Sequence, residues 1–237
     1  MMPQAVILAG GLGTRLKPLT DHMPKPLVPV RGRPFLEWQI LDLKHQGVFH
    51  ILILVSYLGE QIVDHFKEGE SLGVKLDYCF EPEPLGTGGA LVNALAQLED
   101  AFILLNGDSF LHAPLKSMWD DFRSRHLGAL VASYGNQPPT PVPNNLKTSA
   151  GLVRAYEKLA GLEKGFDSVD AGVYILRKSL LEGLSPQKFQ LEELWPDLMT
   201  GDGLGCFPVL DRFYDIGTHD RLKLFEERLN DYFPNAL

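Results

Sequence analysis

The sequence predicts an α/β fold with a mostly parallel sheet covered by helices on both faces. Four apolar runs are interpreted as buried strands, because they lack the polar alternation of a half-exposed strand; they span 5–9, 51–55, 102–106 and 129–134. Segments with helical periodicity separate them, at 34–47, 88–98 and 114–126. Strand and helix in repeated succession indicate a parallel sheet, which binds ligands at the carboxyl ends of its strands.

The second half of the chain follows a different pattern. It begins after an interval at 135–149, which carries four of the 17 prolines and is predicted to be a long surface loop. Beyond it we expect strands at 151–158 and 168–176, a helix at 191–199, a strand pair within 205–217, and a closing helix at 218–233 with Thr218 as its cap. This half is expected to extend the same sheet and to bind a second substrate.

Composition and charge exclude several classes of protein. The 237 residues are 45% hydrophobic and 22% charged, as in ordinary globular proteins. No apolar run approaches the roughly 18 residues of a membrane span, and no basic segment precedes a cleavable apolar core, so we expect a cytoplasmic protein. A net charge of −8 without a dense Lys/Arg stripe argues against nucleic-acid binding. Cys79 and Cys206 lie far apart in apolar stretches, which favours free thiols over a disulfide.

The first candidate site is the stretch LAGGLGTRLKPLTDHMPKPLVPV at 8–30. Its glycines follow a strand, so backbone N–H groups can approach an anion there, and Arg15 adds a planar fork suited to phosphate oxygens. No Walker A or dinucleotide fingerprint is present, and Leu16 stands where the latter needs its last glycine. Lys25 lies between Pro24 and Pro26, whose rings stiffen the segment that presents its ammonium group. A purely structural turn is the alternative for the glycine-rich loop.

Two aspartates are candidate ligands of a Mg²⁺ ion. Asp108 follows the buried strand at 102–106, and Gly107 leaves room for a ligand beside it. Mg²⁺ prefers one or two carboxylates together with phosphate oxygens and water. Asp215, from a distant strand, would complete such a site. The alternatives are a turn aspartate at Asp108 and a carboxylate near the N-terminus of the closing helix at Asp215.

The stretch at 8–30 resembles the signature of the sugar-1-phosphate nucleotidyltransferases, LAGGxGTRLxPLTxxxPKPLxPV. The resemblance spans nearly the whole chain, because it continues in order through EPEPLGTGGA (81–90), LNGDSF (105–110), YEK (156–158), DAGVYIL (170–176) and DIGT (215–218). It implies a Rossmann-like mixed sheet of the nucleotide-diphospho-sugar transferase type. It also implies a reaction with Mg²⁺ in which a nucleoside triphosphate and a sugar 1-phosphate give a nucleotide sugar and pyrophosphate.

The resemblance also implies roles for individual residues. Arg15 would stabilise the departing pyrophosphate and Lys25 the charge on the α-phosphoryl group, while Asp108 and Asp215 would share the metal ion. The residues implied for the sugar phosphate are Lys25, Glu157, Lys158, Asp170 and Gly172, with Leu159 in place of the proline that usually follows the Glu-Lys pair. Those implied for the nucleotide are Leu8, Ala9, Gly10, Gly11, Gly13, Thr14, Arg15, Glu81, Gly86, Thr87, Asn106 and Gly107.

Within this family, four segments look most similar to the D-glycero-D-manno-heptose 1-phosphate guanylyltransferases: GRPFLEWQI, VSYLGEQIVDHF, EPLGTGGAL and FYDIG. Relatives that take UTP or dTTP usually resemble the 81–90 stretch with a glutamine near Glu81. A carboxylate at Glu81 or Glu83 can accept both N–H groups on the edge of guanine, so GTP is favoured. Gly86, Gly88 and Gly89 would let a flat base and its ribose approach closely. The alternative is that both glutamates are solvated loop residues.

Two other functions stay open on the sequence. One is a uridylyl- or thymidylyltransferase that acts on another hexose 1-phosphate. The other is a non-catalytic sugar-nucleotide-binding regulatory protein, which would be expected to lose Arg15, Lys25 or Asp108. We expect a single nucleotidyltransferase domain over residues 1–237, with a nucleotide-binding half at about 1–134 and a sugar-phosphate-binding half at about 150–237. A homo-oligomer is compatible with the sequence, and no nucleic-acid or membrane partner is expected.

Overall fold

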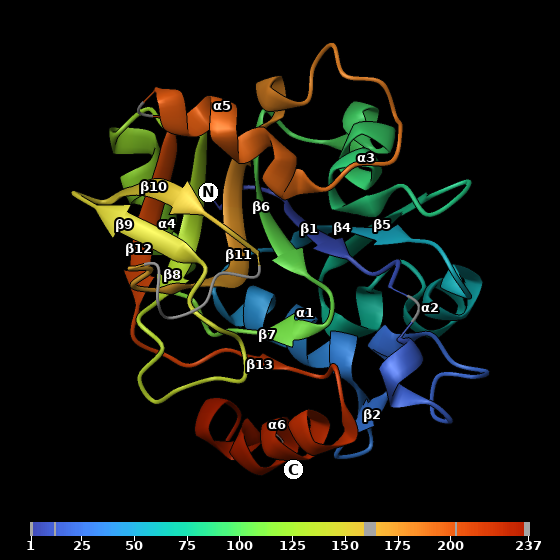
Figure 1. Ribbon diagram of the computed structural model, residues 1–237. Coiled ribbons are helices and arrows are strands. Elements are labelled where there is room, and N and C mark those ends of the chain that lie inside the picture. Colours follow the sequence, from blue (N-terminus) through green and yellow to red (C-terminus); the bar gives the residue numbers. More distant parts are fainter. Residues whose placement is uncertain (1, 12, 159–164, 202, 235–237) are drawn as a thin grey trace.

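The centre of the molecule is a nine-stranded sheet (Figure 1). The computed structural model describes residues 2–11, 13–158, 165–201 and 203–234. In spatial order the strands are β5 (Lys75–Phe80), β4 (His50–Val55), β1 (Ala5–Leu8), β6 (Ala101–Asn106), β11 (Val169–Arg177), β8 (Ala129–Tyr134), β12 (Leu204–Val209), β10 (Leu152–Tyr156) and β9 (Leu146–Ser149). All of them except β10 and β11 run in one direction. The predicted mixed, mostly parallel sheet is confirmed.

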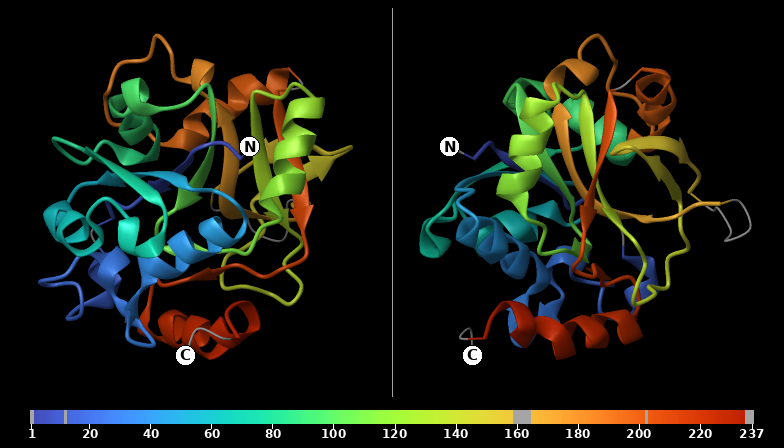
Figure 2. Two further views of the ribbon diagram at one scale, coloured as in Figure 1. Left: turned by 180° about the vertical axis from the view of Figure 1, so that it is seen from behind. Right: turned by 90° about the vertical axis from the view of Figure 1, so that its left-hand side faces the viewer.

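Helices cover both faces of this sheet, as predicted. One face, turned toward the viewer in the left view of Figure 2, is covered by α1 (Phe35–His45), α2 (Gly59–Phe66) and α4 (Leu115–Ser124). The other face is covered by α3 (Gly86–Asn93) and α5 (Trp195–Thr200). Successive side chains of a strand point to opposite faces. In β1, Ala5 and Ile7 join the first apolar cluster and Val6 joins the second. Burial on both faces explains why the four strand runs are continuously apolar.

A third apolar cluster closes one end of the molecule. It is built on α6 (His219–Tyr232), whose Phe225 packs edge-on against Phe35 with ring centroids 5.2 Å apart. Two small sheets lie beside it, one of β7 (Ser109–Phe110) with β13 (Tyr214–Asp215) and one of β2 (Pro29–Val30) with β3 (Arg33–Pro34). The Thr218 side chain accepts a hydrogen bond from the backbone N–H of Arg221, so its predicted role as helix cap is confirmed.

The predicted strand pair within 205–217 is wrong in its pairing. β12 is a strand of the large sheet, parallel to β8, whereas β13 pairs with β7 in a separate sheet. The two strands are close in sequence, which favours a hairpin in a local interpretation. β12 lies between β8 and β10 in the large sheet, and the partner of β13 comes from the first half of the chain, so only the tertiary fold brings these strands together.

Three elements of the large sheet and its helices were not predicted from the sequence, namely β9, α2 and β5. The last part of the supposed surface loop at 135–149 forms β9, an edge strand that pairs with β10. α2 and β5 follow β4, and β5 is the opposite edge of the sheet. Both edge strands mix polar with apolar residues, because part of each strand faces solvent, so neither shows the continuous apolar run of a central strand.

The two cysteines agree with the expectation from the sequence. Cys79 and Cys206 are buried and unpaired, as predicted. Among the described residues, no helix combines the length and the apolar character needed to cross a bilayer.

Candidate active site

The main cavity, of about 590 Å³, opens at the carboxyl ends of β1 and β6. Its size is ordinary for a small-molecule site. Every residue that the resemblance implied for the nucleotide lines this cavity, and so do Lys25 and Asp108. Pro26, Pro84, Ala90, Lys188, Gln190 and Gly217 complete the lining. We call this space the first cavity.

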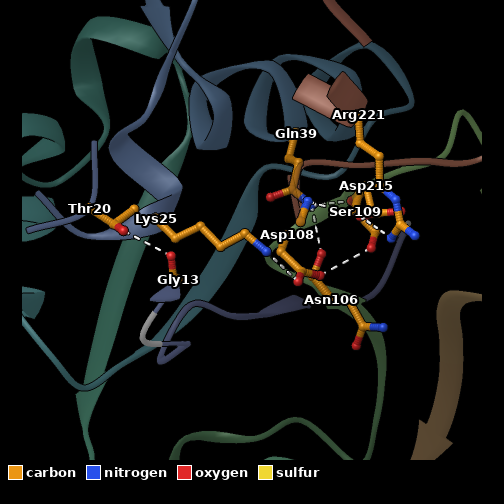
Figure 3. A network of polar contacts seen from close by, with 10 residues as sticks. Gly13, Thr20, Lys25, Gln39, Asn106, Asp108, Ser109, Asp215 and Arg221 are labelled. Atoms are coloured by element: carbon orange, nitrogen blue, oxygen red, sulfur yellow. Dashed lines mark hydrogen bonds and ion pairs between the residues drawn. The ribbon is translucent and has the colours of Figure 1, made fainter. Parts of the chain in front are cut away.

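The loop after β1 is held in place by short contacts around Gly13. This glycine has φ +62°, a left-handed conformation that favours glycine, and the hydroxyl of Thr20 donates a 2.8 Å hydrogen bond to its carbonyl (Figure 3). A Cβ atom at Gly13 would lie 3.0 Å from side-chain atoms of both Thr20 and Lys25. The glycine therefore lets the loop turn tightly over the Lys25 side chain.

Lys25 is one of the few buried charged residues, with 6% of its surface exposed. It begins the short 3₁₀ helix Lys25–Leu27 directly after Pro24, and its Nζ atom contacts Asp108 Oδ2 at 2.6 Å. Burial acts to raise the pKa of Asp108, but the positive charges of Lys25 and Arg15 outweigh it and hold that pKa below its usual value. Asp108 is therefore a carboxylate at neutral pH, as a metal ligand must be.

The turn that carries Asp108 is braced from three sides. Gln39, on α1, donates hydrogen bonds to the carbonyls of Asn106 (2.9 Å) and Ser109 (2.7 Å). The backbone N–H of Ile216 donates to the Asp108 carbonyl at 2.9 Å. Gly107 packs so closely that a Cβ atom would lie 2.3 Å from the Leu8 carbonyl oxygen. The sequence analysis missed Gln39, although a glutamine inside the apolar run FLEWQIL was a usable indication.

Asp215 lies next to this turn, because β13 places it opposite Ser109 of β7. Its Oδ1 atom accepts a 2.8 Å hydrogen bond from the backbone N–H of Gly217. Arg221 Nη1 contacts both carboxylate oxygens, at 3.0 and 3.1 Å, an ion pair that the sequence analysis did not predict (Figure 3). Asp215 is not among the residues that line the first cavity.

The two aspartates form a limited set of metal ligands. Within the described ranges, no three His, Cys, Asp or Glu side chains gather closely enough to hold a metal ion. A pair of carboxylates on adjacent short strands nevertheless suits Mg²⁺, which takes one or two carboxylates and completes its shell with phosphate oxygens and water. Each carboxylate forms an ion pair, Asp108 with Lys25 and Asp215 with Arg221.

A second cavity, of about 540 Å³, adjoins the first. Five residues line both cavities, namely Leu8, Arg15, Thr87, Asn106 and Gln190. Of the residues implied for the sugar phosphate, Lys158 and Asp170 line the second cavity, whereas Glu157 and Gly172 line neither. Leu159 lies outside the described residues. The supposed surface loop supplies part of the wall through Pro141, Val142, Pro143 and Asn145, which the sequence analysis did not assign to a site.

Asp170 is held rigidly in the wall of the second cavity. Its carboxylate accepts hydrogen bonds from the backbone N–H of Gly172 (3.0 Å) and the hydroxyl of Tyr174 (2.9 Å). Gly172 has φ +76° at an irregularity in the pairing of β11 with β8, and a Cβ atom there would lie 2.8 Å from Asn106 Nδ2. Gly172 thus positions Asp170 and Asn106 without lining the cavity itself. Burial raises the pKa of Asp170 to about 6.

Lys158 reaches this cavity from the end of β10. Its side chain is 65% exposed, and its ammonium group pairs with Glu192 in the 3₁₀ helix Leu191–Leu194. An exposed ion pair of this kind holds a lysine only weakly, so a ligand with phosphate charge can compete for it.

The glycines around α3 have a different role from the one proposed from the sequence. A Cβ atom at Gly88 would lie 2.2 Å from the Phe189 ring, and one at Gly89 would lie 2.2 Å from the Gln187 carbonyl oxygen. The backbone N–H groups of both glycines also donate to the Phe189 carbonyl. Neither glycine lines the first cavity. Because they have no side chains, they leave room for the segment at 187–189 from the second half of the chain.

Glu81 and Glu83 differ in position. Glu81 lines the first cavity, where one carboxylate oxygen accepts a 3.0 Å hydrogen bond from the backbone N–H of Leu85. Burial raises the pKa of the Glu81 carboxyl group. Glu83 is exposed and outside the lining of either cavity. Of the two glutamates, only Glu81 is placed to contact a ligand.

Comparison with known proteins gives consistent matches. The family model described as "Nucleotidyl transferase" matches residues 4–229. The D-glycero-alpha-D-manno-heptose 1-phosphate guanylyltransferase of Campylobacter jejuni is 35% identical over 80% of this chain and 83% of its own length. The protein of the same name from Aneurinibacillus thermoaerophilus is 30% identical over 97% and 99%. The crystal structure of HddC from Yersinia pseudotuberculosis complexed with GMP-PN has a TM-score of 0.80 at 31% identity and covers 96% of this chain and 100% of HddC.

Proposed function

This chain belongs to the nucleotidyl transferase family, and from that premise we propose that it transfers GMP from GTP to D-glycero-D-manno-heptose 1-phosphate. The products would be a GDP-heptose and pyrophosphate. The names of the relatives from Campylobacter jejuni and Aneurinibacillus thermoaerophilus support both substrates, and the GMP-PN in HddC supports the guanine nucleotide.

One observation carries this proposal: two cavities of similar size share a wall that includes Arg15 and Asn106. The first cavity would take the triphosphate and the second the sugar 1-phosphate. Two separate substrates can then meet at the shared wall, beside Asp108 and Lys25. Holding both reactants in line converts a bimolecular step into an effectively unimolecular one, and such positioning is, with electrostatic stabilisation, the main way in which a protein catalyses this class of reaction.

The reaction needs no covalent enzyme intermediate. A phosphate oxygen of the sugar 1-phosphate attacks the α-phosphorus of GTP, and the bond from that phosphorus to the bridging oxygen of pyrophosphate breaks. Lys25, buried and stiffened by its prolines, would neutralise charge at the α-phosphoryl group. Arg15 would stabilise the leaving pyrophosphate. Fixed positive charge in a recessed site of this kind is worth far more than in water, because it needs no reorganisation during the reaction.

The proposal includes a divalent metal, which we take to be Mg²⁺, on Asp108 and Asp215. When bound, such an ion neutralises phosphate charge and orients the nucleotide oxygens. The residues that would hold it are braced in advance, Asp108 by the Gln39 and Ile216 contacts to its turn and Asp215 by the Gly217 N–H.

Glu81 is the residue that we propose to recognise the base. Guanine presents N1–H and an exocyclic amine side by side, and a carboxylate can accept both hydrogen bonds. Uracil and thymine present one N3–H and a carbonyl oxygen that would repel the second carboxylate oxygen. The hydrogen bond that the backbone N–H of Leu85 donates to the Glu81 carboxylate would fix the orientation of this carboxylate in the first cavity.

A panel of reactions tests the proposed function. Pyrophosphate release is measured with ATP, CTP, GTP, UTP and dTTP, each against D-glycero-D-manno-heptose 1-phosphate, mannose 1-phosphate and glucose 1-phosphate, with and without Mg²⁺. We expect the highest kcat/KM with GTP and the heptose phosphate. A preference for UTP or dTTP would replace this proposal with a uridylyl- or thymidylyltransferase. No release with any pair would favour a regulatory protein that binds sugar nucleotides.

A further inference from the structure

Arg221 lies between Asp215, to which it is ion-paired, and the second cavity, which it lines. It belongs to the first turn of α6, where its backbone N–H is bound by the Thr218 cap. Its side chain is 26% exposed, that of Asp215 only 14%. Arg221 lines the second cavity, whereas Asp215 lines neither cavity. Arg221 therefore reaches the lining of the second cavity, whereas the carboxylate to which it is bound in Figure 3 does not.

The contacts of this guanidinium group leave part of it available to a ligand. Both hydrogen bonds to Asp215 use Nη1. Across the described ranges of the chain, no hydrogen bond of Nη2 or Nε is found. A guanidinium has five N–H donors in a fixed planar fork, so one edge can hold a carboxylate while the other binds a second anion.

We propose that Arg221 binds the phosphate group of the sugar 1-phosphate and that Asp215 orients it for this task. The inference rests on the proposed function, because it assumes that the second cavity takes the sugar phosphate. It adds a phosphate-binding residue from α6 to a subsite that the sequence had assigned to Lys25, Glu157, Lys158, Asp170 and Gly172.

The charges around the second cavity favour a phosphate at this place. Lys158 and Glu192 are paired with each other, and Asp170 adds a carboxyl group to the wall. The other two cations in the lining are Arg15 and Arg221, and the carboxylate partner of Arg221, Asp215, lies outside the lining. The protein as a whole carries a net charge of −8, so a phosphate dianion would be repelled unless cations are concentrated where it binds.

Arg15 also lies close to Asp215. A Cβ atom at Gly217 would lie 3.2 Å from Arg15 Nη2 and 2.7 Å from Asp215 Oδ1, so the Arg15 guanidinium and the carboxylate that holds Arg221 approach the same small space. Arg15 and Arg221 thus both lie near Asp215, and both line the second cavity. A phosphate there would lie next to the nucleotide that it must attack, and two guanidinium groups would offset the repulsion between the anions.

A purely structural role is the competing explanation, because the ion pair with Asp215 also ties α6 to β13. The two explanations predict different kinetics. A structural ion pair would change the stability and all kinetic constants together. A phosphate anchor would change the KM for the sugar phosphate and spare the KM for the nucleotide.

The test compares Arg221→Gln and Arg221→Lys with the wild type and with Arg228→Gln. Arg228 lies on the same helix, is exposed, and pairs with Asp231, so it is a matched control. The substrates are those of the best wild-type reaction in the panel above, which establishes the proposed function before any variant is made. Binding of mannose 1-phosphate is also measured by calorimetry in EDTA, so that a metal ion makes no contribution.

We expect Arg221→Gln to raise the KM for the sugar 1-phosphate at least tenfold and to change the KM for GTP less than threefold. Mannose 1-phosphate binding in EDTA should weaken by a similar factor. Arg221→Lys keeps the charge but cannot reach Asp215 and the phosphate together, so an intermediate effect is expected. Arg228→Gln should match the wild type.

Three outcomes would overturn the inference. One is unchanged sugar-phosphate KM and binding in Arg221→Gln. The second is an equal rise in the KM values for both substrates, which indicates a structural role. If Arg221→Gln does not fold, Arg221→Lys decides, and a wild-type KM in that variant would reject the phosphate contact. None of these outcomes affects the proposed function, which the wild-type panel tests separately.

Discussion

The first and second cavities are similar in volume and adjoin each other, yet they are lined by different kinds of residue. Six glycines line the first cavity, four of them in the loop after β1 and the turn at the end of β6. The second is formed by side chains that come from β10, β11, the segment at 190–195 and α6, together with the loop at 141–145. A site lined by glycines needs them at fixed local spacing. A site lined by larger side chains depends on which distant segments meet.

This difference has a functional counterpart. In the first cavity, buried Lys25 and the braced Asp108 cannot move far, which suits groups that must stabilise a transition state. In the second cavity, the exposed ion pair of Lys158 with Glu192 is weak, so a ligand could displace Glu192, which would suit substrate capture. We therefore expect substitutions in the first cavity to lower kcat or change the nucleotide, and substitutions in the second to raise the KM for the sugar phosphate.

The largest effect is expected for Asp108→Asn. Loss of the carboxylate removes a charged metal ligand and leaves the Lys25 ammonium group buried without its partner. We expect kcat to fall by at least about a hundredfold, with the fold retained. Steady-state kinetics in saturating Mg²⁺, with circular dichroism as the folding check, measures this. Asp120→Asn, on the exposed face of α4, is the control. Near-wild-type turnover would remove Asp108 from the mechanism.

Glu81→Gln tests whether the first cavity recognises the base. One or two charge-assisted hydrogen bonds from guanine are worth roughly 1.5–3 kcal/mol each, so the wild type should prefer GTP over UTP by roughly tenfold to thousandfold. The variant should lose most of this preference, because an amide offers the donor that the uracil carbonyl needs. Glutamine can still accept from Leu85, so the loop should persist. The ratio of kcat/KM values for GTP and UTP is the measurement.

Glu83→Gln is the matched control for that experiment, because Glu83 is exposed and outside both cavities. Its nucleotide preference should equal that of the wild type. If Glu81→Gln also keeps the wild-type preference, Glu81 braces the loop through Leu85 and does not contact the base.

Lys158→Ala tests the second cavity. The KM for the sugar 1-phosphate should rise about tenfold, as expected for the loss of one charge-assisted contact, while the KM for GTP stays within twofold. Lys116→Ala removes a similarly exposed, ion-paired lysine on α4 and should have no effect. A drop in kcat at unchanged KM would contradict the division of labour between the cavities.

The smallest effect concerns stability and pH. The pKa of Asp170 is raised to about 6 in the folded protein, so the folded state binds more protons than the unfolded state between about pH 4 and pH 6. Its contribution to the free energy of unfolding is therefore present at low pH and is lost as the pH rises through 6. Asp170→Asn should gain about 1–3 kcal/mol relative to the wild type between pH 4.5 and pH 8. Urea unfolding at both values measures this, and a constant difference would contradict it.

Much of the first cavity was predictable because its requirements are local. The stretch at 8–30 carries glycines where the chain turns over Lys25, and the prolines that stiffen this segment are its neighbours in sequence. Asp108 follows a continuously apolar strand, and parallel strands place their carboxyl ends at one edge. The division into two halves, the oligomeric state and the cytoplasmic location stay predictions from the sequence.

The sequence by itself thus determined the central strands and most of the covering helices, the glycine-rich loop and the identity of the principal charged groups. The tertiary structure alone decided that β12 and β13 enter different sheets, that Gly88 and Gly89 admit the segment around Phe189, and that Arg221 holds Asp215. The physical reason is the distance along the sequence over which local patterns act. Periodicity and turn chemistry act within about ten residues, whereas Gln39, Gly88 and Gly89 acquire their roles from partners far away in the sequence. Arg221 and Asp215 are only six residues apart, but they lie on different elements, and no local pattern encodes their contact.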